Sequence, residues 1–352
     1  MLGSRYRSLI NGPHKQSGWK ELLARHETIL VLLLVVEVIY FTVVGRRFAT
    51  ADNVANIVRH SVEIGLLALV MTPIILTGGI DLSVGSMLGL CAVLFGKLWR
   101  DAGLPPWAAG VCTLGIGALC GGFNALLITR LRLPPLIVTL GTFSLFRGLA
   151  EAITQGTDAF TNFPASFLFL GTGQIAGLPT QSWILFAAAI GVWLLVHRTT
   201  FGRSFRAIGF APEGARYAGL PVQRRLALVY VLAGVVAALA ALTYTARFGT
   251  AKADAGTGYE LFAITAVVLG GTSIFGGVGS VHGTLLGVAA VAVLSNGLTR
   301  VPGVMNIASE LSGMLTGALL LLALASGLLP KLLAAWRVRR HSPAKPIEPK
   351  LT

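Results

Sequence analysis

The sequence predicts an all-α polytopic membrane protein with about ten transmembrane helices, and three observations lead to that prediction. Hydrophobic residues fill 54% of the 352 positions and charged residues only 12%, about half the charged share of soluble domains. The apolar runs are long and unbroken, unlike the alternation over about ten residues that a membrane β-barrel strand requires. Basic residues gather in the segments between alternate runs. So high a hydrophobicity also excludes a disordered chain, and only 3 Cys exclude a disulfide scaffold.

Ten apolar stretches approach the roughly 20 residues that a helix needs to cross the hydrocarbon core of a bilayer. The predicted spans are 28–45, 61–77, 83–97, 107–128, 134–153, 181–197, 226–246, 259–275, 281–298 and 311–329. The third and eighth are short and rich in Gly, so their boundaries are the hardest to place. No small-residue cleavage site follows the first run, and we expect that run to stay as an anchor.

The placement of Lys and Arg predicts that both termini face the cytoplasm, because loops on that side carry an excess of basic residues. In this orientation residues 1–27 and 331–352 are basic cytoplasmic segments, and 28–330 form the transmembrane domain. The connection 154–180 contains no Lys or Arg, as expected of an exported loop. The net charge of +14 then reflects cytoplasmic segments, and we expect no nucleic-acid partner. The residues that conflict with this orientation are Arg46, Arg47 and Arg59, so eight or nine spans are alternatives to ten.

Two glycine-rich segments resemble each other. TGGIDLSVGSMLG (77–89) and FGGVGSVHGTLLG (275–287) both contain Gly-Gly followed by Val-Gly-Ser, and each leads into a span of the same predicted direction. Internal duplication is common among transporters. The alternative is a chance resemblance between two segments rich in Gly.

Asp81 and Ser83 lie in the first of these segments, between two predicted spans. The glycines there favour a break in the helix, and broken backbone at membrane depth is tolerated only inside protein or beside water. A carboxylate at such a break either caps the next helix, assisted by the Ser83 hydroxyl, or contacts a solute directly.

Arg147 lies within the predicted span 134–153, where a cation is costly and is expected to face the interior of the bundle. Glu151 follows at i+4 on the same helix face, so one interpretation is an intrahelical ion pair near the interface. The other interpretation is a polar pathway across the membrane. The other candidates for inward-facing polar groups are Asn124, Glu260 and Asn296.

The segment 198–225 predicts a short cytoplasmic helix. Pro212 suits the first helical position, Glu213 suits the dipole of the first turn, and Gly219 suits a C-terminal stop before Pro221. This helix is either a docking element for a soluble partner or part of a solvated basic loop. The sequence has no phosphate-binding P-loop, H-E-x-x-H or G-x-S-x-G motif, so we expect no catalytic residue, metal site or cofactor.

Several segments together resemble one family. They are TGGIDLSVGS (77–86), GGFNALLITRLRLPPLIVTLGTFSLFRGLA (121–150), FGRSFRAIGFAPEGARYAGLPV (201–222) and ELFAITAVVLGGTSIFGGVGSVHGTLLG (260–287). In order and spacing they are similar to the permease subunits of bacterial ABC importers for monosaccharides, a group that includes ribose, xylose, rhamnose and autoinducer-2 permeases. The resemblance runs from about residue 28 to 330. Residues 246–256 and 298–315 look most similar to the autoinducer-2 and rhamnose permeases.

The resemblance implies an inner-membrane complex that imports a sugar or sugar-like solute. Two permeases, identical or paired with a sister chain, form the channel, two cytoplasmic ATPase subunits drive it, and a periplasmic binding protein delivers the solute. The family's ATPase-coupling helix corresponds to residues Pro212, Glu213, Gly214, Ala215, Arg216 and Gly219. The chain departs from the family at Pro212-Glu213-Gly214, where a polar residue commonly precedes Ala-Ala-Arg, and it has Gly214-Ala215 in place of Ala-Ala.

Other functions are alternatives. A permease for branched-chain amino acids belongs to a related family. An ion-coupled secondary carrier needs titratable groups in the bundle, for which Asp81, Glu63 and Glu37 are candidates. A membrane enzyme is opposed by the absence of catalytic motifs.

Overall fold

The computed structural model describes the backbone of residues 26–341 and the side chains of 27–325, and within this part the chain is helical except for one short hairpin. The helices are α3 (His26–Val44), α4 (Ala51–Leu76), α5 (Val84–Arg100), α6 (Pro106–Thr129), α7 (Pro135–Ile153), α8 (Ala165–Thr172), α9 (Thr180–Trp193), α10 (Thr200–Phe210), α11 (Pro212–Tyr217), α12 (Val222–Phe248), α13 (Tyr259–Leu269), α14 (Val281–Leu298) and α15 (Ala308–His341). A π-helical turn (Leu194–Arg198) follows α9, and a 3-10 turn (Met305–Ile307) precedes α15. Strands β1 (Gln174–Ile175) and β2 (Leu178–Pro179) pair antiparallel. Of the predicted cytoplasmic tails, residues 1–25 and 342–352 lie outside the described chain.

Eight of the described helices are long and apolar enough to cross a membrane, fewer than the ten spans predicted. The predicted span 83–97 forms α5, which has 17 residues, and 259–275 forms α13, which has only 11. The helix α13 is short because Gly270 and Gly271 follow it, and Gly271 adopts a φ of +84° that a helix cannot continue. The prediction of ten is therefore too high by the criterion of length.

The helix α4 begins ten residues before the predicted start at residue 61. The Thr50 hydroxyl caps it by accepting a hydrogen bond from the Asn53 backbone N–H over 3.4 Å. The first turns were not predicted as helix because they carry polar residues. Asn53 is nevertheless buried, since its amide donates to Asn296 Oδ1 on α14 over 2.9 Å.

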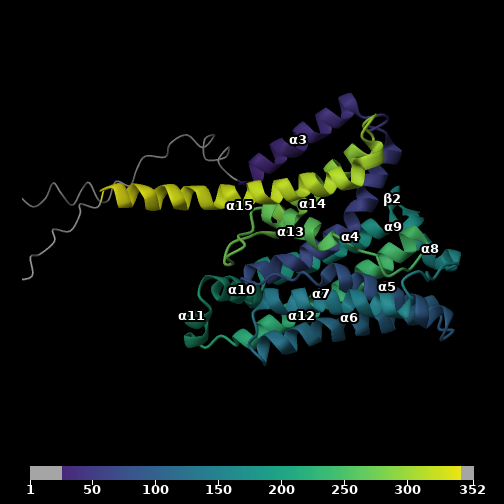
Figure 1. Ribbon diagram of the computed structural model, residues 1–352, viewed down its shortest axis with the longest axis horizontal. Helices are drawn as coiled ribbons and strands as arrows, with labels where there is room; N and C mark the ends of the chain where they lie inside the picture. Colours follow the sequence, from purple (N-terminus) through teal and green to yellow (C-terminus); the bar gives the residue numbers. More distant parts are fainter. Residues whose placement is uncertain (1–25, 342–352) are drawn as a thin grey trace, which may run out of the picture.

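Close approach between helices depends on glycine, as expected for membrane helices. The helices α6 and α12 lie side by side along their length (Figure 1). A Cβ on Gly117 of α6 would lie 2.3 Å from the Gly234 carbonyl oxygen of α12, and one on Gly121 would lie 2.2 Å from the Tyr230 carbonyl oxygen. On the other side of the bundle, a Cβ on Gly287 of α14 would lie 2.0 Å from the Ala266 carbonyl oxygen of α13. These glycines bring two backbones into contact.

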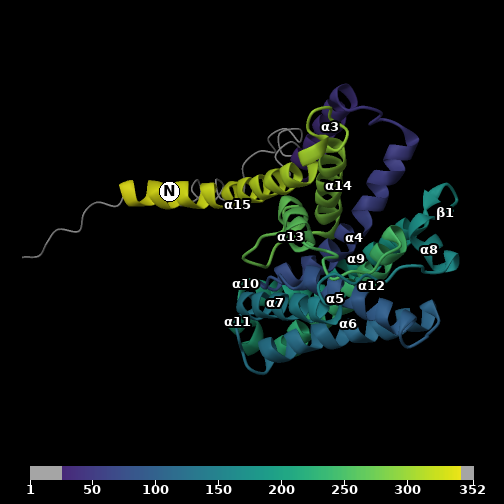
Figure 2. The ribbon, with the colours of Figure 1, turned by 45° about the vertical axis from the view of Figure 1, so that its right-hand side comes forward.

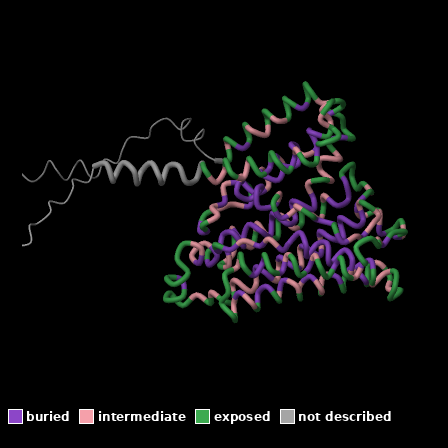
Figure 3. The backbone as a smooth tube through the Cα atoms, viewed as in Figure 1, coloured by how far each residue is buried: buried purple, intermediate pink, exposed green. Residues whose placement is uncertain are grey.

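The bundle has two ends that differ in structure, and both views show them apart (Figures 1 and 2). We name the first the hairpin end, because it carries β1, β2 and α8. There the Arg46 N–H donates to the Arg300 carbonyl over 2.8 Å, and Phe160 pairs with Ala251. The second, the α11 end, carries α10, α11 and the loops 77–83 and 270–280. Buried residues concentrate between the ends along α4, α5 and α12, whereas α3 is largely exposed (Figure 3).

Candidate functional site

The helix α11 is a defined element outside the bundle, at the α11 end. Pro212 opens it, and Gly219 ends it with a φ of +81°. The Gly219 N–H donates to the Arg216 carbonyl and the Leu220 N–H to the Ala215 carbonyl, each over 3.0 Å. This pair of bonds is the Schellman motif that closes a helix. The short helix predicted for this segment is thus present, and it ends at Tyr217, two residues before Gly219.

Several large side chains of the α10–α11 segment are largely exposed in the described chain. Tyr217 is 88% exposed and Phe210 is 70% exposed, while Glu213 and Arg216 are also exposed. Ala215 alone of the α11 residues is buried. The segment therefore presents aromatic and charged groups outward and is anchored on its other side.

Three backbone segments meet directly beneath α10, at a place that we name the glycine crossing (Leu76, Gly78, Gly209, Gly276 and Gly277). The Gly277 N–H donates to the Leu76 carbonyl oxygen over 2.9 Å, which joins the loop before α14 to the end of α4. Gly209 of α10 lies on this junction. A Cβ on Gly209 would be 2.0 Å from the Leu76 carbonyl oxygen and 2.4 Å from the Gly277 nitrogen. No side chain separates α10 from the two glycine-rich loops.

Asp81, Ser83 and Asn124 form one buried network at the start of α5. Asp81 Oδ1 accepts from the Ser83 N–H over 2.8 Å and from the Ser83 hydroxyl over 2.6 Å. The Asn124 amide of α6 donates to Ser83 Oγ over 2.9 Å. All three side chains are fully buried. Ser83 is the N-cap residue of α5 and its own side chain makes no cap bond to the helix, so the bonds to Asp81 form a buried turn that leads into α5 and is tied to α6 by Asn124.

Arg147 of α7 binds backbone carbonyls and not a carboxylate of its own helix. Its guanidinium donates to the carbonyl oxygens of Ala253 and Ala255, the latter over 3.1 Å. Both lie in the connection between α12 and α13. The expected pair with Glu151 is wrong: within the described chain no ion pair joins these two residues. The long-range partner is invisible to a rule based on i+4 spacing.

The connection that Arg147 holds lies on a glycine face of α5. A Cβ on Gly89 would be 2.8 Å from the Ala253 carbonyl oxygen. A Cβ on Gly85 would be 2.0 Å from Oε2 of Glu260, which is buried at the start of α13. Arg147 and Glu260 thus lie against one stretch of α5, on either side of the 253–256 backbone.

A buried ion pair absent from the sequence predictions joins α4 to α12. Glu63 Oε2 lies 3.3 Å from Arg247 Nη1, and Arg247 also donates to the Arg59 carbonyl over 3.0 Å. Gln181 donates to the same carbonyl over 3.2 Å. Glu63 was recognised only as a titratable group, because nothing local connects it to a residue 184 positions away.

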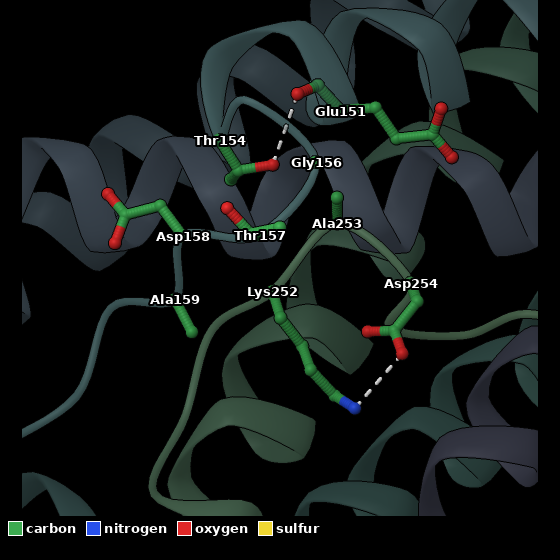
Figure 4. Close-up of a pocket in the computed structure, with 9 residues that line it drawn as sticks. All are labelled: Glu151, Thr154, Gly156, Thr157, Asp158, Ala159, Lys252, Ala253 and Asp254. Carbon is green, nitrogen blue, oxygen red and sulfur yellow. Dashed lines mark hydrogen bonds and ion pairs between the residues drawn. The ribbon is translucent and has the colours of Figure 1, made fainter.

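A polar cavity of about 490 Å³ opens at the hairpin end (Figure 4). Glu151, Asp158, Lys252 and Asp254 line it together with backbone of both connections. Lys252 Nζ lies 3.0 Å from Asp254 Oδ2, and this hydrogen bond raises the pKa of Lys252 above its usual value. The presence of Glu151 in this cavity agrees with its separation from Arg147.

The candidate residues therefore fall into separate groups. Asp81, Ser83 and Asn124 lie together, Arg147 and Glu260 flank the α12–α13 connection, and Asn296 pairs with Asn53. The α10–α11 segment is remote from Arg147. Among the described residues no cluster of three His, Cys, Asp or Glu side chains is placed to hold a metal ion.

Comparison with known proteins agrees with this architecture. Residues 53–324 match the family described as "Branched-chain amino acid transport system / permease component". The chain is 38% identical over 337 residues to the autoinducer 2 import system permease protein LsrD of Yersinia pseudotuberculosis serotype O:1b, covering 94% of this chain and 98% of the relative. It is 38% identical over 302 residues to LsrD of Photorhabdus luminescens, covering 84% and 89%. No solved structure matches at a comparable level.

The matches extend across the bundle from α4 to α15 and include both glycine-rich loops and the α10–α11 segment. A match of this length shows a transport subunit and not an enzyme. The chain belongs to the family of membrane permease components of ABC importers.

Proposed function

We propose that this permease imports a small sugar-like solute of the autoinducer-2 or rhamnose kind, with the α11 end in the cytoplasm. The solute class rests on the relatives' names, since the LsrD proteins are permeases of autoinducer 2 import systems. The orientation rests on charge. The basic residues of the α11 end are Arg198, Arg203, Arg206, Arg216, Arg224 and Arg225, whereas 154–180 carries none. An even number of spans then places both chain termini in the cytoplasm.

In this proposal α10–α11 docks on a cytoplasmic ATPase subunit, and the hairpin end receives a binding protein. A second permease, identical or sister, completes the channel. The observation that carries the proposal is the glycine crossing. Because Gly209 touches both Leu76 and Gly277 without an intervening side chain, a displacement of α10 moves the ends of α4 and of the loop before α14 together.

The two loops at the crossing also support an internal duplication. Gly78 and Gly276 both adopt left-handed backbone, with φ of +81° and +86°. Each loop interrupts the chain just before a helix, α5 or α14. We propose that they are equivalent breaks in two related halves.

The test is docking and uptake in the assembled importer. Gly214→Arg with Arg216→Glu places a bulky cation and a reversed charge on α11. We expect normal insertion, ATPase binding weakened about tenfold or more (about 1.4 kcal/mol), and loss of uptake. Lys97→Glu, on a side chain 52% exposed at the other end, is the matched control for docking and keeps ATPase binding. Normal uptake by the α11 variant would overturn the coupling assignment.

The family description favours one other solute, a branched-chain amino acid. Uptake driven by ATP with labelled autoinducer-2, rhamnose, ribose and leucine separates the two. The ion-coupled carrier is tested by the permease alone in liposomes. Solute accumulation there on an ion gradient would replace the proposal.

A further inference from the structure

We propose that a cavity between α4, α13, α14 and α15 is the chamber in which the permease holds its solute, and that it takes a small uncharged polyhydroxylated molecule. This inference rests on the proposed import function and names its site. The cavity has a volume of about 450 Å³, within the range of small-molecule sites. It lies in the half of the bundle next to the hairpin end, since its lining includes the first residues of α13 and the last of α14.

Hydroxyl groups line the cavity from three helices. Thr265 comes from α13, Ser295 from α14, and Ser312 and Thr316 from α15, while His60 adds an imidazole from α4. The hydroxyls of Ser295 and Ser312 lie 2.7 Å apart and fasten α14 to α15. These two hydroxyls hold the wall together, and each keeps the capacity for a further hydrogen bond to a ligand.

Two of these hydroxyls have no protein partner. Thr265 is 0% exposed and Thr316 is 2% exposed, and neither Oγ1 makes a hydrogen bond within the described chain. Most buried Thr hydroxyls in this bundle bond to a carbonyl of their own helix, as Thr113 does to Ala109 over 2.7 Å. Three other buried Thr hydroxyls of the described chain, those of Thr180, Thr245 and Thr272, also lack a partner, so Thr265 and Thr316 differ from them by lining the cavity. Neither oxygen has appreciable accessible surface, so a ligand hydroxyl in the cavity satisfies it only when the Thr side chain turns toward the cavity.

The charge of the lining selects the class of ligand. None of the described residues that line the cavity is Asp, Glu, Lys or Arg, so an ion finds no counter-charge there. Apolar carbon, including that of Leu261 and Phe262, makes up most of the wall. Hydroxyl groups beside apolar surface match a sugar-like molecule, whose polar edge and carbon face need both. A site with few strong contacts also releases its solute readily, as transport requires.

Glycine leaves the room that the solute would occupy. Gly313 and Gly317 lie four residues apart on α15 and both line the cavity. A Cβ at either position would meet no atom within 4 Å. A leucine there fills the cavity without displacing backbone, and it raises the helix propensity of α15.

The experiment uses the complete importer, with ATPase and binding protein, in proteoliposomes. Gly313→Leu and Gly317→Leu are compared with Gly115→Leu, on an exposed face of α6 where a Cβ also meets open space. With labelled autoinducer-2, rhamnose and ribose as probes, we expect the cavity variants to lose uptake at least tenfold. Binding-protein-stimulated ATP hydrolysis stays within twofold of the unmodified complex, and Gly115→Leu changes neither.

A second pair of variants keeps the test independent of side-chain volume. Thr265→Val and Thr316→Val remove a hydroxyl from the cavity, and Thr113→Val is the matched control outside it. We expect the solute concentration for half-maximal uptake to rise several-fold in Thr265→Val and in Thr316→Val, and to stay unchanged in Thr113→Val. Unchanged uptake by the leucine and valine variants, with normal protein levels, would overturn the inference. Absence of ATP-driven uptake in the unmodified complex would instead overturn the proposed function and the inference with it.

Discussion

The carboxylate of Glu63 on α4 lies 3.3 Å from the guanidinium of Arg247 on α12, with side-chain exposures of 0% and 9%. These two helices form much of the buried core; Glu63 has no exposed surface, whereas Arg247 also lines a cavity with Arg59 and His60. A charge left alone in such a place costs far more than the pair contributes, because its desolvation is no longer compensated.

We therefore predict that Glu63→Leu or Arg247→Met alone lowers the free energy of unfolding by about 3–5 kcal/mol. The double variant, with both charges gone, loses much less than the sum. Thermal unfolding in detergent measures the three variants. Lys97→Met, which breaks an exposed pair with Asp101, costs at most about 1 kcal/mol as a control. Additive losses in the double variant would contradict the ion pair.

A methyl group on Gly209 tests the glycine crossing. In most helices Gly→Ala stabilises by about 0.5–1 kcal/mol. Here the new Cβ would lie 2.0 Å from the Leu76 carbonyl oxygen, so α10 has to move away from the junction. We expect an importer that carries Gly209→Ala to hydrolyse ATP without moving solute. The measured quantity is the amount of solute taken up per ATP hydrolysed. Gly191→Ala on α9, where a Cβ meets open space, leaves that ratio unchanged. An unchanged ratio in Gly209→Ala would show that the contact does not transmit motion.

Arg147→Lys and Glu151→Gln separate the two interpretations of the charge in α7. The guanidinium of arginine donates to the carbonyl oxygens of both Ala253 and Ala255, and a lysine ammonium does not reproduce its planar geometry. A buried carbonyl that loses its hydrogen bond costs about 1–3 kcal/mol. We expect Arg147→Lys to lower the melting temperature and to expose the 249–258 connection to protease. Glu151→Gln changes neither. Equal effects of both substitutions would restore the intrahelical pair.

Local signals in the sequence predicted the elements that local chemistry determines. Pro212 and Gly219 sufficed for α11, because a helix start and stop depend on neighbouring residues. The polar turn at Asp81 followed from a break at Gly78 and an acceptor close behind it. Most membrane spans followed from hydropathy in the same way.

Local sequence signals do not predict contacts between segments that lie far apart in the chain. Arg147 finds its carbonyls more than 100 residues away, and the early turns of α4 are helical because Asn53 meets Asn296 across the bundle. The sequence also gives the positions of the glycines, but it does not predict which backbone segment packs against each of them. The cavity lined by Thr265 and Thr316 depends on how four helices pack, and no motif marks it.

The network at the start of α5 separates a structural role of Asp81 from solute contact. Asp81→Asn keeps an oxygen that accepts from Ser83, whereas Asp81→Ala leaves the Ser83 N–H and hydroxyl unmet. A buried donor left without its partner costs about 1–3 kcal/mol, and Asn124 transmits the loss to α6 through its bond to Ser83. We expect Asp81→Ala to reduce the amount of folded protein and its melting temperature, and Asp81→Asn to do so much less. Size-exclusion chromatography of the expressed variants measures both. Folded protein at the normal level in Asp81→Ala, with uptake of one solute lost, would mean that the carboxylate touches the solute and not the helix.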